Sequence, residues 1–376
     1  MNSPFRECIV VTGLGVVSPI GWDLQQFWNN LQSPNKIQHD GTAQFSGHID
    51  DFGPLAKDTK RLIRKSIKLM NRETQLGVAA AQHAITNSGL LNADYQPDRI
   101  GVCFGAGNVE IRRSDFQAGV EACQDLMLQF DPALWGQLGV PHVDPLWILR
   151  VLPNMPACHA AIANDLRGPN NTITQATVAS CMAFAEARNA ILDGDADAMI
   201  VGGTGTNLLE TLQSGIQPIA SPAEGAAAFV IERRQRAIER GAVIYGEILG
   251  ASSATAIDTD HRARPSEAIA GVIDNAICQS GLDPILIHSI QTNRDATEFD
   301  AISGRIGEPP INSIIDRTGD AAAGSSALSI AATLLAIHHG ENKTSATINI
   351  DAMDNGLASC VVFANSQVPA TARDAA

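Results

Sequence analysis

The sequence predicts an α/β protein in which strands and helices alternate through two similar halves. Short apolar runs bounded by glycine alternate with longer stretches whose apolar residues recur at helical spacing. Each half also contains a strand, a turn and a helix of small residues, at 178–192 and 321–338. Finally, 376 residues with 45% hydrophobic and 18% charged side chains are more than one core usually holds, so we expect two closely joined domains.

The first half is expected to contain four strands and three long helices. The strands are predicted at 8–11, 99–104, 198–201 and 226–232, and the helices at 24–31, 72–88 and 178–192. Helix 72–88 should end at Gly89, because glycine adopts the left-handed conformation that terminates helices. Helix 178–192 is mostly small and aliphatic, which is typical of a helix buried inside a protein.

The second half begins after a charged link at 233–241. Its strands are predicted at 243–249, 287–292, 311–315, 345–350 and 358–364, and its helices at 266–280 and 321–338. The predicted division of the chain is therefore an N-terminal half at 1–240, a C-terminal half at 241–366 and a flexible tail at 367–376.

Composition excludes several classes of protein. A net charge of −14 opposes binding to nucleic acid, and the one basic run, between Lys57 and Arg72, lies on an amphipathic helix. No apolar run is long enough to insert in a membrane, and the N-terminus lacks the apolar core of a signal peptide, so we expect a cytoplasmic protein.

The sequence gives no clear sign of a metal or a cofactor. Seven cysteines without a CxxC pair are best explained as reduced thiols of the core, so neither zinc nor disulfides are expected. The glycines Gly13 and Gly15 follow a strand but lack a third partner, which makes a dinucleotide site a weak prediction. We therefore expect no metal and no cofactor.

The turn before helix 178–192 has the geometry of a seat for a nucleophile. Unpaired amides and the helix dipole favour negative charge at a helix N-terminus and lower the pKa of a thiol there. The occupant of this turn is Thr177, whose hydroxyl is far harder to ionise than a thiol. Thr177 could simply cap the helix, which is worth about 1 kcal/mol. Cys181 lies one turn further on, ~6 Å along the axis.

Several segments resemble the β-ketoacyl synthase (condensing enzyme) family. They are the strand at 9–21, Pro153-Asn154-Met155 with Cys158-His159, Glu224-Gly225-Ala226-Ala227, and Thr318-Gly319 before a glycine-containing helix. The resemblance covers nearly the whole chain. It implies a thiolase-like fold, five layered as αβαβα with duplicated halves, and a dimer whose first halves pair across a two-fold axis.

The resemblance also shows which reactive groups are missing. Thr177, eight residues after Pro169 and seventeen before Gly194, occupies the position of the family's catalytic cysteine. Asn293 lies where the family has its first histidine, and Asp320, which suits a helix N-terminus, replaces the second.

Two further family features are absent. The lysine that the family carries before Thr318-Gly319 is missing, and Met353 to Leu357 replace the late Gly-Phe-Gly-Gly loop. Thr177, Asn293 and Asp320 are therefore predicted to be vestigial, and no catalytic residue is expected.

A branch of the family called chain-length factors keeps the fold without the cysteine and pairs with an active ketosynthase in type II polyketide systems. The resemblance to this branch predicts a non-catalytic partner that shapes the acyl tunnel. Candidate tunnel or interface residues are Phe104, Asn108, Trp147, Leu149 and Met155. Trp147 and Leu149 could equally be ordinary packing residues of the interface.

The expected partners are a catalytic β-ketoacyl-ACP synthase subunit and, mainly through that subunit, an acyl carrier protein. The basic run at 57–72 is either a solvated helical face or part of a carrier-protein docking surface. Threonine at the nucleophile position, where chain-length factors of aromatic systems usually have glutamine, favours an aryl polyene system. Two alternatives stay open: an active decarboxylase or acyltransferase that uses Thr177 or Cys181, and a stand-alone acyl-binding homodimer.

Overall fold

The computed structural model describes residues 8–107, 113–208, 221–292, 306, 309–340 and 346–365. Ten strands in this part of the chain form one hydrogen-bonded sheet in the order β3-β2-β4-β5-β1-β6-β10-β9-β7-β8. The strands are β1 Ile9–Val17, β2 Ile100–Gly105, β3 Asn170–Ile173, β4 Ala198–Thr206, β5 Glu224–Arg233, β6 Gly246–Thr255, β7 Ile287–Thr292, β8 Ile311–Asn312, β9 Ala346–Ala352 and β10 Leu357–Ala364.

The helices lie above, between and below the two halves of this sheet. They are α1 Leu24–Gln32, α2 Lys57–Ser66, α3 Arg72–Ser88, α4 Gln117–Ala122, α5 Trp147–Val151, α6 Met155–Asn164, α7 Ala179–Leu192, α8 Arg234–Glu239, α9 Pro265–Ser280, α11 Ile315–Thr318 and α12 Ala323–His338. Within the described ranges, no helix combines the length and apolar character needed to cross a membrane.

The strand order confirms the predicted duplication. Strands β1 to β5 are arranged as third-second-fourth-fifth-first, and strands β6 to β10 repeat that arrangement from the opposite edge. The two half-sheets meet through a short antiparallel pairing of β1 with β6, from Ile9 opposite Ile248 to Val11 opposite Gly246. Each half is thus the same five-stranded unit.

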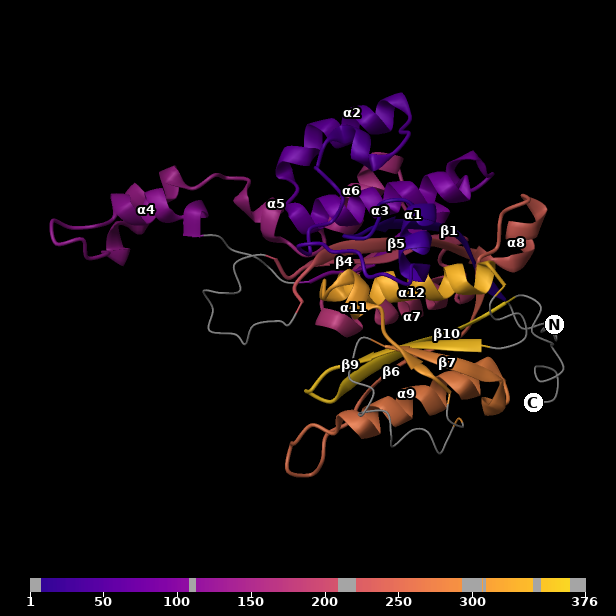
Figure 1. The fold of residues 1–376 in the computed structure, drawn as a ribbon. Helices are drawn as coiled ribbons and strands as arrows, with labels where there is room; N and C mark the ends of the chain where they lie inside the picture. Colours follow the sequence, from indigo (N-terminus) through magenta and orange to yellow (C-terminus); the bar gives the residue numbers. More distant parts are fainter. Residues whose placement is uncertain are drawn as a thin grey trace.

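The layers follow from three hydrophobic clusters (Figure 1). Helices α3 and α6 cover the outer face of the first half-sheet, and α9 covers the outer face of the second. Helices α7 and α12 lie between the two half-sheets. Phe184 of α7 shows this position, because its ring contacts Phe229 of β5 at 5.0 Å and Phe363 of β10 at 5.5 Å. The predicted αβαβα layering is confirmed.

The long helices begin and end close to the predicted positions. Helix α3 spans Arg72–Ser88 as predicted, because the Asn71 side chain accepts from the Thr74 amide at one end. At the other end Gly89 is left-handed, with φ of 64°. Helices α7, α9 and α12 match their predicted ranges within two residues.

One local prediction was wrong, because the predicted strand 311–315 is paired only at Ile311 and Asn312 before α11 begins. The predicted charged link at 233–241 contains the short helix α8. Strand β8 is short because it lies at the edge of the sheet and pairs only with β7. We propose the division of the halves at 240/241, between α8 and β6. The predicted tail at 367–376 lies outside the described residues.

Residues 113–146 project from the layered body on the side of the N-terminal half (Figure 1). This projecting segment has a small aromatic centre, in which Phe116 contacts Trp135 at 6.4 Å and Trp147 at 4.8 Å between ring centroids. Its tip exposes three apolar side chains: Leu126 is 105%, Met127 80% and Leu128 76% exposed. Such exposure is uncommon on an isolated domain and is typical of a surface that meets another molecule.

The residue before α12 provides a test of backbone strain. Ala322 has φ of 52° and ψ of −124°, a region that glycine adopts readily and alanine does not. We expect Ala322→Gly to raise the free energy of unfolding by about 1 kcal/mol, measured by denaturant titration. The matched change Ala327→Gly, in the interior of the same helix, should lower it. A loss of stability in Ala322→Gly would contradict the strain.

Candidate functional site

The turn between β3 and α7 is a strained connection. After β3 the chain passes through a single 3₁₀ turn, Ala176–Val178, directly into α7. Ala176 has φ of 44°, in the left-handed region that costs a non-glycine residue about 1–3 kcal/mol. Thr177 follows this residue and is half-buried. The sharp turn expected for a nucleophile seat is therefore present.

Thr177 does not cap the helix, so that prediction was wrong. The N-cap of α7 is Val178, and no side chain accepts a hydrogen bond from the first helical amides. The hydroxyl of Thr177 makes no hydrogen bond to any residue that the structure describes. The reason is the intervening 3₁₀ turn, which moves the start of the helix two residues beyond Thr177.

Asp320 lies in the corresponding turn before α12. Its Oδ1 accepts a hydrogen bond from the Ala322 amide at 2.9 Å and lies 3.4 Å from the Ser325 hydroxyl. The carboxylate therefore meets the positive end of α12, as predicted, although the N-cap itself is Ala322. Any negative charge that developed in this region would face a carboxylate rather than an imidazole.

A hydrogen bond joins the starts of the two central helices. The Ser180 hydroxyl in α7 donates to the Ala323 carbonyl at 2.7 Å, and both residues are buried. The structure thus brings the turns of Thr177 and Asp320 together. The sequence analysis did not identify Ser180. The only hint in the sequence is that a serine stands among the small residues at the start of this helix. The predicted positions Asn293 and Asn108 lie outside the described residues.

Cys181 has the environment of a core thiol. Its side chain is fully buried, and its Sγ lies 3.6 Å from the Ser326 hydroxyl and 3.9 Å from the Asn349 carbonyl. Burial, together with the nearby charge of Asp351, raises the pKa of the Cys181 thiol well above its ordinary value. A thiolate nucleophile is therefore disfavoured at this position.

The remaining candidate ligands do not assemble into a centre. His159 in α6 is 7% exposed, and burial lowers its pKa, so it is held neutral. Its Nε2 has no hydrogen-bond partner among the described residues. In the same part of the chain, no group of three or more His, Cys, Asp or Glu side chains is placed to hold a metal ion.

The predicted tunnel residues occupy three different environments. Phe104 is fully buried in the cluster between the first half-sheet and α3. Met155 begins α6 and is 8% exposed. Trp147 and Leu149 are half-buried in α5, at the base of the projecting segment. Among the described candidates, Trp147 and Leu149 are the most exposed, and the tunnel or interface role of all of them stays a prediction.

The basic run divides into a surface and a buried part. In α2, Lys57, Arg64 and Lys65 are exposed and form no ion pair with a described residue. Lys68, just after this helix, is exposed and unpaired in the same way. Arg72 differs, because it forms an ion pair with the buried Glu224 and lies 5.1 Å from the centroid of the Phe45 ring. Arg72 is therefore structural.

Comparisons with known proteins agree with this architecture. The family model "Beta-ketoacyl synthase, N-terminal domain" matches residues 6–218, which is more than half of the chain. A 3-oxoacyl-[acyl-carrier-protein] synthase 2 from Synechocystis sp. is 28% identical over 93% of this chain and 89% of its own length.

Two solved structures share the fold. The ishigamide ketosynthase/chain length factor aligns with a TM-score of 0.71 at 19% identity, covering 96% of this chain and 100% of that one. A type II PKS acyl-carrier protein in complex with its ketosynthase aligns with a TM-score of 0.68 at 20% identity, over 96% and 100% of the two chains. The fold is thus thiolase-like, as predicted.

Thiol labelling tests the assignment of Cys181 to the core. Alkylation by iodoacetamide at pH 8, followed by peptide mass spectrometry, should modify the exposed Cys278 quickly. Cys181 and Cys103 should be protected until the protein is unfolded, since burial raises the pKa of Cys103 to about 12 and that of Cys181 well above its usual value. Faster labelling of Cys181 than of Cys278 in the native protein would identify Cys181 as a reactive thiol.

Proposed function

Because the chain belongs to the β-ketoacyl synthase family, we propose that it is a non-catalytic, chain-length-factor-like partner of an active β-ketoacyl-ACP synthase. The observation that carries the proposal is the strained turn at Ala176. In this turn, Thr177 occupies the position at which the family has its nucleophile. A fold that keeps the nucleophile turn but has a different residue in it has the shape of a condensing enzyme without its chemistry.

The groups around the seat support this proposal. Threonine needs a positioned base to become a nucleophile, and the Thr177 hydroxyl has no hydrogen-bond partner among the described residues. Decarboxylation of a malonyl group releases an enolate, which donors or cations would stabilise. Asp320 instead brings a carboxylate to this region. Cys181 is a buried thiol of raised pKa and is no substitute.

The surface of the N-terminal half supports a protein partner. Strand β3 is an edge strand, and its Asn170 and Asn171 are exposed. The projecting segment leaves the body between β2 and β3 and carries the exposed apolar tip at 126–128. An edge strand and an exposed apolar segment are both features that association with another protein would cover. Trp147 and Leu149, at the base of the segment, would then approach the partner's acyl chain.

The proposed setting is a cytoplasmic type II system that extends a chain held on an acyl carrier protein, with aryl polyene synthesis as the preferred pathway. One of the structurally similar proteins was solved as a type II PKS acyl-carrier protein in complex with its ketosynthase, which supports a carrier protein as a second partner. The preference for aryl polyenes rests on threonine at position 177. Bulky walls at Trp147 and Leu149 would limit product length at ~0.8 kcal/mol per excluded methylene.

Purification from the native host with a tag on this chain tests the proposal. We expect a β-ketoacyl-ACP synthase that carries its catalytic cysteine to co-purify in equal amount, identified by mass spectrometry. During turnover with acyl and malonyl carrier proteins, intact-mass analysis should find the acyl group on that subunit alone. The variant Thr177→Ala should retain condensation within about twofold, because the hydroxyl takes no part in the reaction.

Two outcomes would contradict the proposal. An acyl adduct on this chain during turnover would show that it is an enzyme, as its relative from Synechocystis sp. is named. A loss of several hundredfold in Thr177→Ala, with the fold intact by circular dichroism, would show the same. The control variant Thr174→Ala lies in the exposed link after β3 and should behave as the native complex does.

Charge reversal on α2 tests the carrier protein as a second partner. Arg64 is exposed and has no ion pair with a described residue, so an acidic carrier protein could approach it. We expect Arg64→Glu in the complex to weaken association with the carrier protein roughly threefold to tenfold at low salt. The loss should shrink at high salt, where exposed charges are screened.

The matched control for this variant is Arg262→Glu. Arg262 is also exposed, but it lies in the hairpin after β6 on the opposite side of the layered body from α2 (Figure 1). Binding measured by surface plasmon resonance should not change in this control. Equal effects of the two substitutions would mean that α2 has no special role and is a solvated face.

A further inference from the structure

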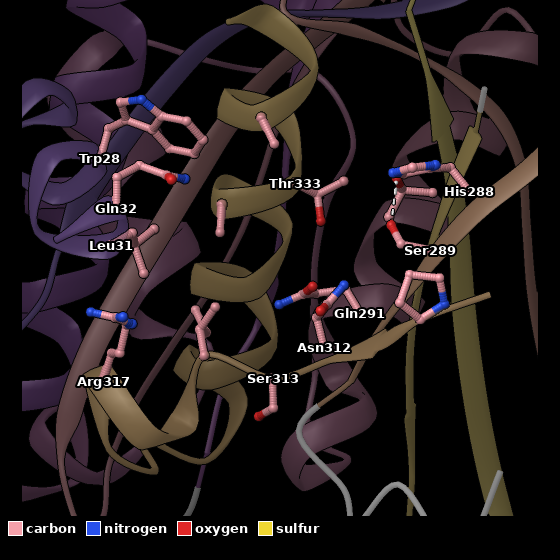
Figure 2. Close-up of a pocket in the computed structure, with 15 residues that line it drawn as sticks. Trp28, Leu31, Gln32, His288, Ser289, Gln291, Asn312, Ser313, Arg317 and Thr333 are labelled. Atoms are coloured by element: carbon pink, nitrogen blue, oxygen red, sulfur yellow. Dashed lines mark hydrogen bonds between the residues drawn. The ribbon is translucent and has the colours of Figure 1, made fainter. Parts of the chain in front are cut away.

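A groove unrelated to the turn of Thr177 crosses the boundary between the two halves (Figure 2). Its volume is about 390 Å³, which is within the range of small-molecule sites. One wall is α1, the opposite wall is formed by β7 and β8, and the floor is the second half of α12. Its lining residues are Trp28, Leu31, Gln32, His288, Ser289, Gln291, Pro310, Asn312, Ser313, Ile314, Arg317, Ala332, Thr333, Ala336 and Thr347.

A side-chain amide of β7 lines the groove. Gln291 is 9% exposed as a residue, and its amide, which makes no hydrogen bond to a described residue, is open to the groove. The Asn312 side chain lies beside it, in the paired register of β7 and β8 (Figure 2). Together these two amides offer donors and acceptors to a group bound between the walls.

The opposite wall supplies a fixed positive charge. The Nη1 of Arg317 donates to the Ser33 carbonyl at 2.9 Å and approaches the Asn30 carbonyl at 3.4 Å, at the end of α1. No described residue accepts from its Nε or Nη2. A guanidinium held by one nitrogen keeps its other N–H groups available, in an orientation suited to a carboxylate.

The charge of the groove contrasts with that of the chain. The chain has 40 acidic residues, but the residues that line the groove include no aspartate or glutamate and one permanent cation, Arg317. The α12 floor of the groove includes Ala332 and Ala336, whose side chains are apolar. The groove therefore combines one cation, an apolar floor and two side-chain amides.

We propose that this groove binds a small organic carboxylate that carries an amide or hydroxyl group at its far end. The carboxylate pairs with Arg317, the carbon skeleton lies on Ala332 and Ala336, and the far polar group meets Gln291 and Asn312. The ligand contacts α1 of the N-terminal half and β7 and β8 of the C-terminal half, so its binding adds to the cohesion of the two halves. This site is independent of the proposed partner and of Thr177.

The described residue Ile306, from the connection between β7 and β8, packs in the cluster with α9 on the opposite face of the sheet. The Ser289 and Thr347 hydroxyls, which lie 3.2 Å apart, pair with each other at the groove's inner edge. Gln291 and His288 are the other groups of β7 that line the groove.

A series of amido acids measures the predicted spacing. Isothermal titration of the purified protein, or of its complex, would use N-acetylglycine, 4-acetamidobutanoate and 6-acetamidohexanoate as probes. One member should bind at least tenfold more tightly than hexanoate, which lacks the amide, and N-hexylacetamide, which lacks the carboxylate. Inorganic phosphate tests whether the groove binds any anion through Arg317 alone. If phosphate binds as tightly as every amido acid, the proposal is wrong.

Two variants test the residues. Gln291→Leu should weaken the preferred amido acid at least tenfold while leaving the melting temperature nearly unchanged, because its amide makes no hydrogen bond to a described residue that the substitution would break. Arg317→Gln should abolish the preference for the carboxylate and leave N-hexylacetamide unaffected. The matched control Gln25→Leu, on the exposed side of α1, should change neither. Binding that Gln291→Leu does not alter, or no binding by any probe, would overturn the proposal.

Discussion

The direct contact between the start of α12 and the backbones of β4 and β5 determines how the two half-sheets pack on the central helices. A Cβ at Gly205 would lie 2.2 Å from the Ala321 carbonyl oxygen, and one at Gly324 would lie 2.1 Å from the Gly225 carbonyl oxygen. Helix and sheet therefore approach more closely than any other residue permits. Because α12 is held against the first half-sheet while its other side faces the second, the two halves cannot pack independently. The layered body is one cooperative unit, although it is built from a repeated motif.

This contact explains how two strained turns can be maintained. Ala176 and Ala322 stand before the two central helices, and both have positive φ, with 44° and 52° respectively. Each conformation costs energy that the surrounding packing must offset. The Ser180 hydroxyl bound to the Ala323 carbonyl ties the turns to each other. Relaxing one turn would disturb both helices and both half-sheets. The site's geometry can thus persist for structural reasons, which is what a shape-giving subunit requires.

The long elements could be predicted from the sequence because local signals agree with the fold. Asn71 and Gly89 bound α3, and small residues mark α7 and α12 as buried. The errors arise where tertiary context decides. Pairing with a single neighbour shortens β8, and burial beside Glu224 takes Arg72 out of the basic surface. The 3₁₀ turn that separates Thr177 from α7 has no sequence signal, so its capping role was wrongly predicted. The groove could not be predicted, because its walls come from segments almost 300 residues apart.

The overall acidity of the chain does not oppose an acidic carrier protein at α2. At physiological ionic strength, charges further apart than about 8 Å are largely screened, so the face that a partner meets matters more than the net charge of −14. Two cations of α2 are paired, Lys60 with Asp50 of the preceding 3₁₀ turn at 2.6 Å and Arg61 with Asp58 at 3.9 Å. Lys57, Arg64 and Lys65 remain as local excess positive charge. The same reasoning applies to the groove, where Arg317 has no acidic neighbour in the lining. In both places basic side chains without an acidic partner are at least partly exposed on a negative molecule, which would favour the approach of the proposed anionic partners there.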